Sequence, residues 1–332
     1  MDFIHVPKVN VQSSFQYLLI TSNEFIISET PSDAFIQIAL ANINYNYYSR
    51  KELYVSSKKI TSHDLEIQYP ENFYTYRDSI KLNNDALKNY YTYYQFINRY
   101  LDNLSHDSHK KQAPFFNKVS YNHQTQKLRL IDSLITNTQL HDNLLQNNVK
   151  KYLVHADDPK KEHDLVALYK ELDHDQKHQK EIERYAHNTS KINAGELIPN
   201  LALLTDSKET ISIQKINDSK TVFFFWNSES VKHYKEIHGR IEELKSKYPE
   251  YDFVGINTGT DFAAWHQTVI SSGYNQENEY QLKNSTAAKN ALFINSANKA
   301  MIVDTGGIIL EGNSNLFNQN FETLLLGHLN QK

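Results

Sequence analysis

The sequence predicts a two-domain α+β protein, with a mostly helical accessory domain over residues 1–190 and an α/β sandwich with a mixed sheet over residues 191–332. Before about residue 190, apolar residues recur at steps of three and four, which is the period of an amphipathic helix. Beyond that point, short apolar runs typical of buried strands alternate with helical patterns. Glycine is scarce, with 9 residues, and tyrosine is abundant, with 22, which favours helices packed through aromatic rings over an all-β chain.

Three apolar runs predict the helices of the first domain. The first run consists of Leu87, Tyr90, Tyr94, Ile97, Leu101 and Leu104; the second of Ile131, Leu134, Ile135, Leu144, Leu145, Val149 and Leu153; the third of Leu165, Leu168, Tyr169 and Leu172. We interpret the tyrosines as core residues. The polar stretches LSHDSHKKQAP and HADDPKKEH, with Pro114 and Pro159 as helix-stop signals, predict exposed loops between these helices.

Near the start of the chain, the segment FQYLLITSNEFIISE fits either a strand or a helix, so we expect mixed structure in the first fifty residues.

Composition and the start of the chain disfavour several classes of protein. No basic stretch followed by a long apolar run opens the sequence, so we expect no secretory signal in it, and no run reaches the ~20 apolar residues of a membrane span. With 35 basic and 39 acidic residues and no long Lys/Arg run, we expect no nucleic-acid binding.

The second domain shows strands and helices in alternation. Short β-like pieces in AGELIPNLALLTDSKETISI precede the buried strand TVFFFW. The further elements are a helix through Ile237, Ile241 and Leu244, the strand YDFVGIN, a helix with Phe262, Trp265 and Val269, the apolar piece ALFI, the strand AMIVD, a turn at Gly306 and Gly307, the strand IIL and a last helix with Phe317, Phe321, Leu324, Leu325 and Leu329. This order predicts a three-layer sandwich that ends in a hairpin and a closing helix.

These elements and phrases resemble the TlpA-like (ResA-like) branch of the thioredoxin superfamily over roughly residues 193 to 330. GELIPNLALLTDSKETISI is similar to the family's entry segment, and FFFWNSES to its strand ending in Phe-Trp before the active-site turn. YDFVGIN is similar to its central strand, and MIVDTGGIIL to its Asp-x-x-Gly hairpin. The helical part, with YNYYSRKELY and YPENFYTYRDSI, resembles the extra domain that precedes thioredoxin modules in some bacterial envelope proteins.

The resemblance aligns the family's two active-site cysteines with Ser230 and His233 in the stretch FFFWNSESVKHY, which also contains Trp226, Val231 and Lys232. The family's chemistry needs a thiolate at the start of a helix, where the helix dipole lowers its pKa. The chain has no cysteine at all, so thiol–disulfide exchange is excluded. We expect Ser230 to cap the helix by accepting a backbone N–H bond.

A second part of the family's site is also replaced. The resemblance implies a cis-proline facing the active site, and counting back from Asp304 puts Asn298 at that position. The last proline of the chain is Pro249. Because a cis bond before a residue other than proline costs about 2.5–4 kcal/mol, we expect a trans bond and a differently shaped loop at Asn298.

Two alternative sites carry less weight. Ser230 and His233 lie one helical turn apart, which would suit an activated serine in a hydrolase or acyl-transfer enzyme, but neither a G-x-S-x-G elbow nor an orienting acid accompanies them. His174 and His178 lie four residues apart on a predicted helix, a spacing that can hold a metal. We interpret them as part of a solvated, charged helix face and expect no metal. No phosphate-binding or dinucleotide-binding glycine pattern appears, so we expect no cofactor.

We therefore expect a redox-inactive, thioredoxin-like protein of the cell envelope that binds or scaffolds a protein or peptide partner and is not an enzyme. Its groove would be formed by the stretch from Trp226 to His233 and by the loop near Asn298. The envelope location follows from the family resemblance. The other alternative is a diverged copy of a thiol-disulfide oxidoreductase whose module has a purely structural role.

Overall fold

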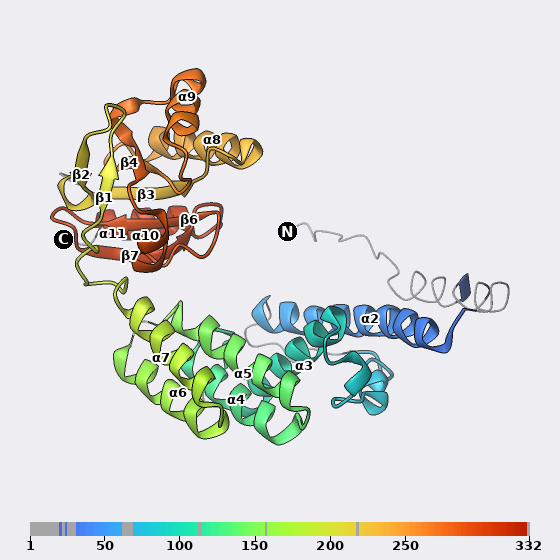
Figure 1. Cartoon of the computed structure of the whole chain (residues 1–332). Helices are drawn as coiled ribbons and strands as arrows, with labels where there is room; N and C mark the ends of the chain where they lie inside the picture. Colours follow the sequence, from blue (N-terminus) through green and yellow to red (C-terminus); the bar gives the residue numbers. More distant parts are fainter. Residues whose placement is uncertain are drawn as a thin grey trace, which may run out of the picture. The chain divides into compact units, whose positions relative to one another are not determined.

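The computed structural model of the chain describes residues 20–21, 24, 31–61, 69–111, 114–156, 158–216 and 219–330. Two units emerge from the contacts within the chain: an N-terminal unit of residues 1–152 and 163–182, and a C-terminal unit of residues 153–162 and 183–332. Figure 1 shows the helices of the first unit in blue to green and the sheet of the second in yellow to red. The predicted division at residue 190 stays a prediction; Ser190 is the last residue of α7.

Helices make up the N-terminal part of the described chain. They are α2 (Asp33–Thr61), α3 (Tyr91–His109), α4 (Tyr121–Leu134), α5 (Thr138–Leu153), α6 (Pro159–Leu172) and α7 (Gln176–Ser190), with short 3₁₀ turns at Thr75–Ser79 and Asp85–Leu87. The prediction of a mostly helical first domain is confirmed. The segment predicted as mixed, FQYLLITSNEFIISE, lies almost entirely outside the described residues.

Three details of the predicted helices are wrong. Helix α3 begins at Tyr91 and continues to His109, so Leu87 precedes it and the polar stretch LSHDSH belongs to a helix whose residues His106 and His109 are buried. The second predicted run is two helices, α4 and α5. Pro159 is the first residue of α6 instead of a stop, a position that tolerates proline because the first N–H of a helix has no intrahelical acceptor.

A seven-stranded mixed sheet organises the C-terminal unit. Its strands are β1 (Ala202–Leu204), β2 (Thr210–Ser212), β3 (Thr221–Trp226), β4 (Asp252–Asn257), β5 (Glu279–Leu282), β6 (Lys299–Val303) and β7 (Ile309–Asn315), in the order β2-β1-β5-β4-β3-β6-β7. Strands β3, β4 and β5 are parallel, whereas β6 is antiparallel to both β3 and β7. The predicted strands TVFFFW and YDFVGIN are confirmed, and β5 was not predicted.

Helices cover both faces of this sheet, as the predicted three-layer sandwich requires. Every residue of β3 is buried, and successive side chains alternate between the two faces. Val222, Phe224 and Trp226 pack with α8 (Val231–Lys247), α9 (Phe262–Ser272) and α11 (Phe321–Asn330). Phe223 and Phe225 pack with α10 (Ser285–Ala291) and with the segment around Ile198. The apolar piece ALFI is the end of α10 and the turn after it.

Two turn features explain why the hairpin forms where the sequence predicts it. Gly306 and Gly307 both have positive φ, 89° and 92°, a conformation that glycine adopts without the steric cost of a side chain.

No described helix is both long enough and apolar enough to cross a membrane.

Candidate functional site

Ser230 occupies the N-cap position of α8, at the turn that joins β3 to this helix. The prediction that its hydroxyl caps the helix is wrong, because that hydroxyl accepts no bond from the first turn. The backbone φ and ψ of Ser230 are −104° and 81°. The turn is instead held by other groups: the Ser230 N–H donates to the Asn227 carbonyl at 3.0 Å, and the Ser228 N–H donates to the Asn257 side chain at 3.1 Å.

His233 and Asn298, the two residues aligned with a cysteine and with the cis-proline, are brought together. The His233 ring Nε2 lies 3.2 Å from Asn298 Oδ1 and donates to it, because an amide oxygen can only accept. The Asn298 carbonyl in turn accepts from the Leu316 N–H at 3.0 Å. The start of α8, the turn before β6 and the end of β7 are thus linked at one place.

This arrangement gives no support to a serine nucleophile. His233 bonds to Asn298, and none of its hydrogen bonds goes to the hydroxyl of Ser230. A serine used for acyl transfer needs a base within hydrogen-bonding reach. Peptide bonds in the described part of the chain are all trans, including those around Asn298, as the lack of a nearby proline predicts.

The exposed part of the stretch runs from Glu229 to Lys232, across the end of the turn and the first residues of α8. The Lys232 side chain is 88% exposed, and Val231 is 55% exposed. Trp226 is 1% exposed, so its ring belongs to the core and does not line a surface groove. Phe317, next to the Leu316 that bonds Asn298, is a further exposed apolar residue of this region.

Residues of β3, β5 and α8 form a buried polar cluster that no motif in the sequence predicted. The Glu279 carboxylate accepts from Trp226 Nε1 at 2.9 Å and lies 3.1 Å from His238 Nε2. The other ring nitrogen of His238 is 2.7 Å from the Tyr234 carbonyl. The His238 ring is stacked on the Tyr274 ring, with centroids 3.7 Å apart. All the polar atoms of this chain of contacts therefore have partners, as burial requires.

One sequence signal could have revealed this cluster. Gly255 interrupts the apolar strand YDFVGIN, and a glycine inside a strand often marks the close approach of another group. Gly255 is the register partner of Glu279, and a Cβ at position 255 would overlap the Glu279 carboxylate. The glycine is thus required by the buried glutamate of the neighbouring strand.

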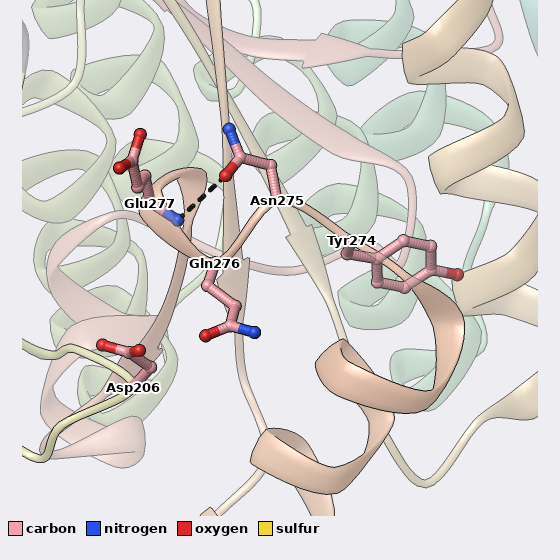
Figure 2. A pocket seen from close by; sticks show the side chains of 5 residues that line it. All are labelled: Asp206, Tyr274, Asn275, Gln276 and Glu277. Atoms are coloured by element: carbon pink, nitrogen blue, oxygen red, sulfur yellow. Dashed lines mark hydrogen bonds between the residues drawn. The ribbon is translucent and has the colours of Figure 1, made fainter.

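A pocket of about 550 Å³ adjoins the cluster on the side of Tyr274. Figure 2 shows its lining residues, which are Asp206, Tyr274, Asn275, Gln276 and Glu277. Asp206 comes from the β1–β2 hairpin, and the Tyr274 ring points away from the other four side chains (Figure 2). The pocket carries two carboxylates, those of Asp206 and Glu277, and Tyr274 both lines it and stacks on His238.

Lys299 follows Asn298 and is fully buried in β6. Its Nζ donates to Asn313 Oδ1 at 3.1 Å and lies 5.9 Å from the centre of the Phe293 ring. Burial lowers the pKa of Lys299 to about 7. The next residue to the candidate site is thus a lysine that loses its proton near neutral pH.

The two histidines considered for metal binding are not on one helix face. His174 precedes α7, which begins at Gln176, and the His178 ring lies 3.2 Å from the Asp173 carboxylate. Within the described ranges, no group of three or more histidine, aspartate or glutamate side chains is arranged to hold a metal ion.

Among solved structures, similar chains come from bacterial thioredoxin-like proteins. A thioredoxin-like protein from Bacteroides caccae has a TM-score of 0.39 at 11% identity, over 69% of this chain and 93% of that one. A thiol-disulfide oxidoreductase from Bacteroides fragilis has a TM-score of 0.34 at 16% identity, over 40% of this chain and 99% of that one. The thioredoxin domain of a thiol-disulfide oxidoreductase from Bacteroides vulgatus has a TM-score of 0.33 at 13% identity, over 41% of this chain and 98% of that one. No family model and no curated protein matches the chain.

The order and direction of the strands agree with the fold that the sequence resemblance implies. The parallel β3–α8–β4 unit, the antiparallel β6–β7 pair and the closing α11 follow one another as in the predicted sandwich. The chain contains no cysteine. The C-terminal unit therefore has a thioredoxin-like fold, and a chain without cysteine cannot carry out thiol–disulfide exchange.

Proposed function

We propose that the C-terminal unit is a non-catalytic binding module, which holds an extended peptide segment of a partner protein without covalent exchange. The observation that carries this proposal is the His233–Asn298 hydrogen bond at 3.2 Å, which joins the two replaced parts of the family's site. A bond between these two side chains gives the site a defined shape while leaving no nucleophile in it. Such a site suits recognition better than chemistry.

The partner surface consists of Val231, Lys232, His233, Asn298 and Phe317. Val231 and Phe317 are 55% and 44% exposed and offer apolar contacts, and Lys232 adds a positive charge. Exposed apolar residues near one another on a protein surface are typical of interaction sites. An extended segment with apolar side chains and an acidic residue would complement this surface.

The cell envelope is the compartment that we propose for this interaction. The proposal rests on the resemblance of the chain's phrases to TlpA-like proteins and of its helical part to the extra domain of some envelope proteins. Fractionation of native cells, with the chain detected by antibody, tests it; recovery only with cytosolic markers would contradict the envelope location.

Site-specific photo-crosslinking in native cells tests the binding function. A photoreactive residue at Lys232 is expected to capture one defined partner, and the same residue at Glu242 is the control. Glu242 lies on the same helix and its side chain is 73% exposed, so it too is accessible to a partner. The partner should also disappear when Val231→Asp is combined with the Lys232 probe.

Two results would contradict the binding function. One is the same set of adducts at positions 232 and 242, which would indicate random collision. The other is a specific adduct that persists in the Val231→Asp variant, which would place the partner elsewhere. A serine-directed probe that labels Ser230 would instead revive the acyl-transfer alternative.

A further inference from the structure

Ionisable side chains lie buried in the N-terminal unit, where α3 ends and α4 begins. Asp102, His106 and His109 of α3 and His123 and Lys127 of α4 are each at most 5% exposed. Burying charged and polar groups is costly unless they bond to one another. The cluster is therefore a place where a change of protonation would have a large structural effect.

His123 donates one hydrogen bond in this cluster and accepts another. His123 Nε2 lies 3.2 Å from the Asp102 carboxylate, which is ionised beside Lys127 and so can only accept. The neutral His123 ring thus carries its proton on Nε2, and its Nδ1 accepts from His109 Nε2 at 3.4 Å. A second proton on His123 would occupy Nδ1, and two N–H groups would then face each other across the bond to His109.

The same cluster holds the latch segment, which we define as residues 114–120. The Pro114 carbonyl accepts from His106 Nε2 at 2.9 Å, and Lys118 Nζ lies 3.4 Å from the Asp102 carboxylate. The Phe116 ring, 8% exposed, packs between the His106 and His123 rings, with centroids at 5.1 Å and 5.7 Å. The position of this segment thus depends on both histidines.

The other charges around His123 are mostly positive. Lys127 follows it on α4, Lys118 belongs to the latch segment, and Lys151 of α5 lies close enough to interact with Asp102 and Lys127. From α2, Lys59 pairs with Asp107 of α3 at 2.9 Å and lies 5.9 Å from the centre of the Phe116 ring. Burial, opposed by Asp102, lowers the pKa of His123 to about 4. Asp102 alone among these carboxylates bonds to His123 directly.

We propose that this cluster is an acid-sensitive latch, in which protonation of His123 breaks its bond to His109, releases residues 114–120 and exposes the Phe116 ring. The segment is bistable because its closed form needs neutral His123. Its open form lets the ring enter water, where the imidazolium is stable. Because protons bind more tightly to the open form, acid shifts the equilibrium toward it, and no other ligand is needed.

The size and sign of the effect follow from proton linkage. An open segment returns the pKa of His123 to its ordinary value of about 6.5, so below that pH the open form binds more protons than the closed form. With a closed-state pKa of about 4, the opening equilibrium constant rises about 30-fold between about pH 7.5 and about pH 5. Carboxylates with ordinary pKa values stay ionised in this interval and therefore do not contribute to the change.

Hydrogen exchange of the full chain, read by mass spectrometry and corrected for the intrinsic pH dependence of exchange, tests the latch. Amide protection in residues 114–124 is expected to fall about 30-fold on acidification. The His123→Gln variant, whose side-chain amide can still donate to Asp102, should lose this drop. His178→Gln, a histidine of the same unit bonded to Asp173, is the matched control and should keep it.

Three outcomes would overturn the latch. The first is equal protection of residues 114–124 at both pH values in the unaltered protein. The second is a drop that persists in folded His123→Gln. The third needs no variant: an NMR titration of the histidine rings in which His123 of the folded protein titrates near 6.5 would show that its closed form tolerates the proton.

Discussion

His233 and Asn298 meet at 3.2 Å although 65 residues separate them in the sequence. The sequence resemblance aligns them with a catalytic cysteine and a cis-proline, and here they bond to each other. The contact is a polar bridge between α8 and the turn before β6. Its contribution to stability and to binding can be measured separately.

A double-mutant cycle measures the stability of this bridge. His233→Ala, Asn298→Ala and the double variant are expected to show a coupling of about 0.5–1.5 kcal/mol, the usual net contribution of a hydrogen bond to stability. Urea unfolding followed by tryptophan fluorescence reports on the C-terminal unit alone, because both tryptophans, Trp226 and Trp265, lie in it. Lys232→Ala is the exposed control, and strictly additive effects of the two changes would mean that the bond does not stabilise the fold.

Gly255→Ala should destabilise the C-terminal unit by about 1–3 kcal/mol, the usual cost of overpacking a buried site. The new Cβ would overlap the Glu279 carboxylate and displace it from Trp226 and His238. Tryptophan fluorescence is expected to shift in the folded state as well. Gly239→Ala in α8 is the matched control: a Cβ there meets nothing within 4 Å, so it should stabilise the helix by about 0.5–1 kcal/mol. Equal effects of the two changes would contradict the role of Gly255.

Lys299→Met should raise the free energy of unfolding at neutral pH, since a buried lysine without an ion-pair partner in the described chain is replaced by an apolar side chain of similar length. Because burial lowers the pKa of Lys299 to about 7, the unfolded state binds more protons between about pH 7 and pH 10. The stability of the unaltered protein should therefore rise with pH in that interval by up to about 1.4 kcal/mol per unit relative to the variant. Parallel stability curves for the two proteins would contradict a neutral, buried Lys299.

Glu52→Gln should destabilise the N-terminal unit by about 3–5 kcal/mol, the usual cost of breaking a buried ion pair. The fully buried Glu52 carboxylate accepts from Arg77 at 2.8 and 2.9 Å, from the Tyr76 hydroxyl at 2.6 Å and from the Asn103 amide at 2.6 Å. Hydrogen exchange in α2 and α3 is the measurement. Asp107→Asn, which removes a half-exposed carboxylate paired with Lys59, is the control and should cost less. Unchanged protection of α2 in Glu52→Gln would refute a stabilising role for this network.

The spacing of apolar residues predicts best those helices and strands whose buried side chains are themselves apolar. β3 and β4 are continuous apolar runs, and α8 carries Ile237, Ile241 and Leu244 at helical spacing, so each was visible in a short window of sequence. β5 was missed because its four residues, EYQL, have a polar residue at every other position, and both Glu279 and Gln281 are buried by neighbours from distant parts of the chain. The polar pattern of LSHDSH predicts a loop for the same reason, because its histidines are buried by Phe116 and by α4.

Composition and order sufficed for the central conclusion about chemistry. A chain without cysteine cannot exchange disulfides in any fold, and the succession of strands and helices pointed to the thioredoxin-like sandwich. The partners of the replaced residues could not be read in this way. That His233 bonds to Asn298 and not to Ser230, that Glu279 takes the space left by Gly255, and that His123 faces His109 all depend on contacts between separate elements. Such contacts form when the sheet register and the helix packing bring side chains from distant parts of the sequence together. A pattern within a short stretch of sequence carries no information on which side chains will meet.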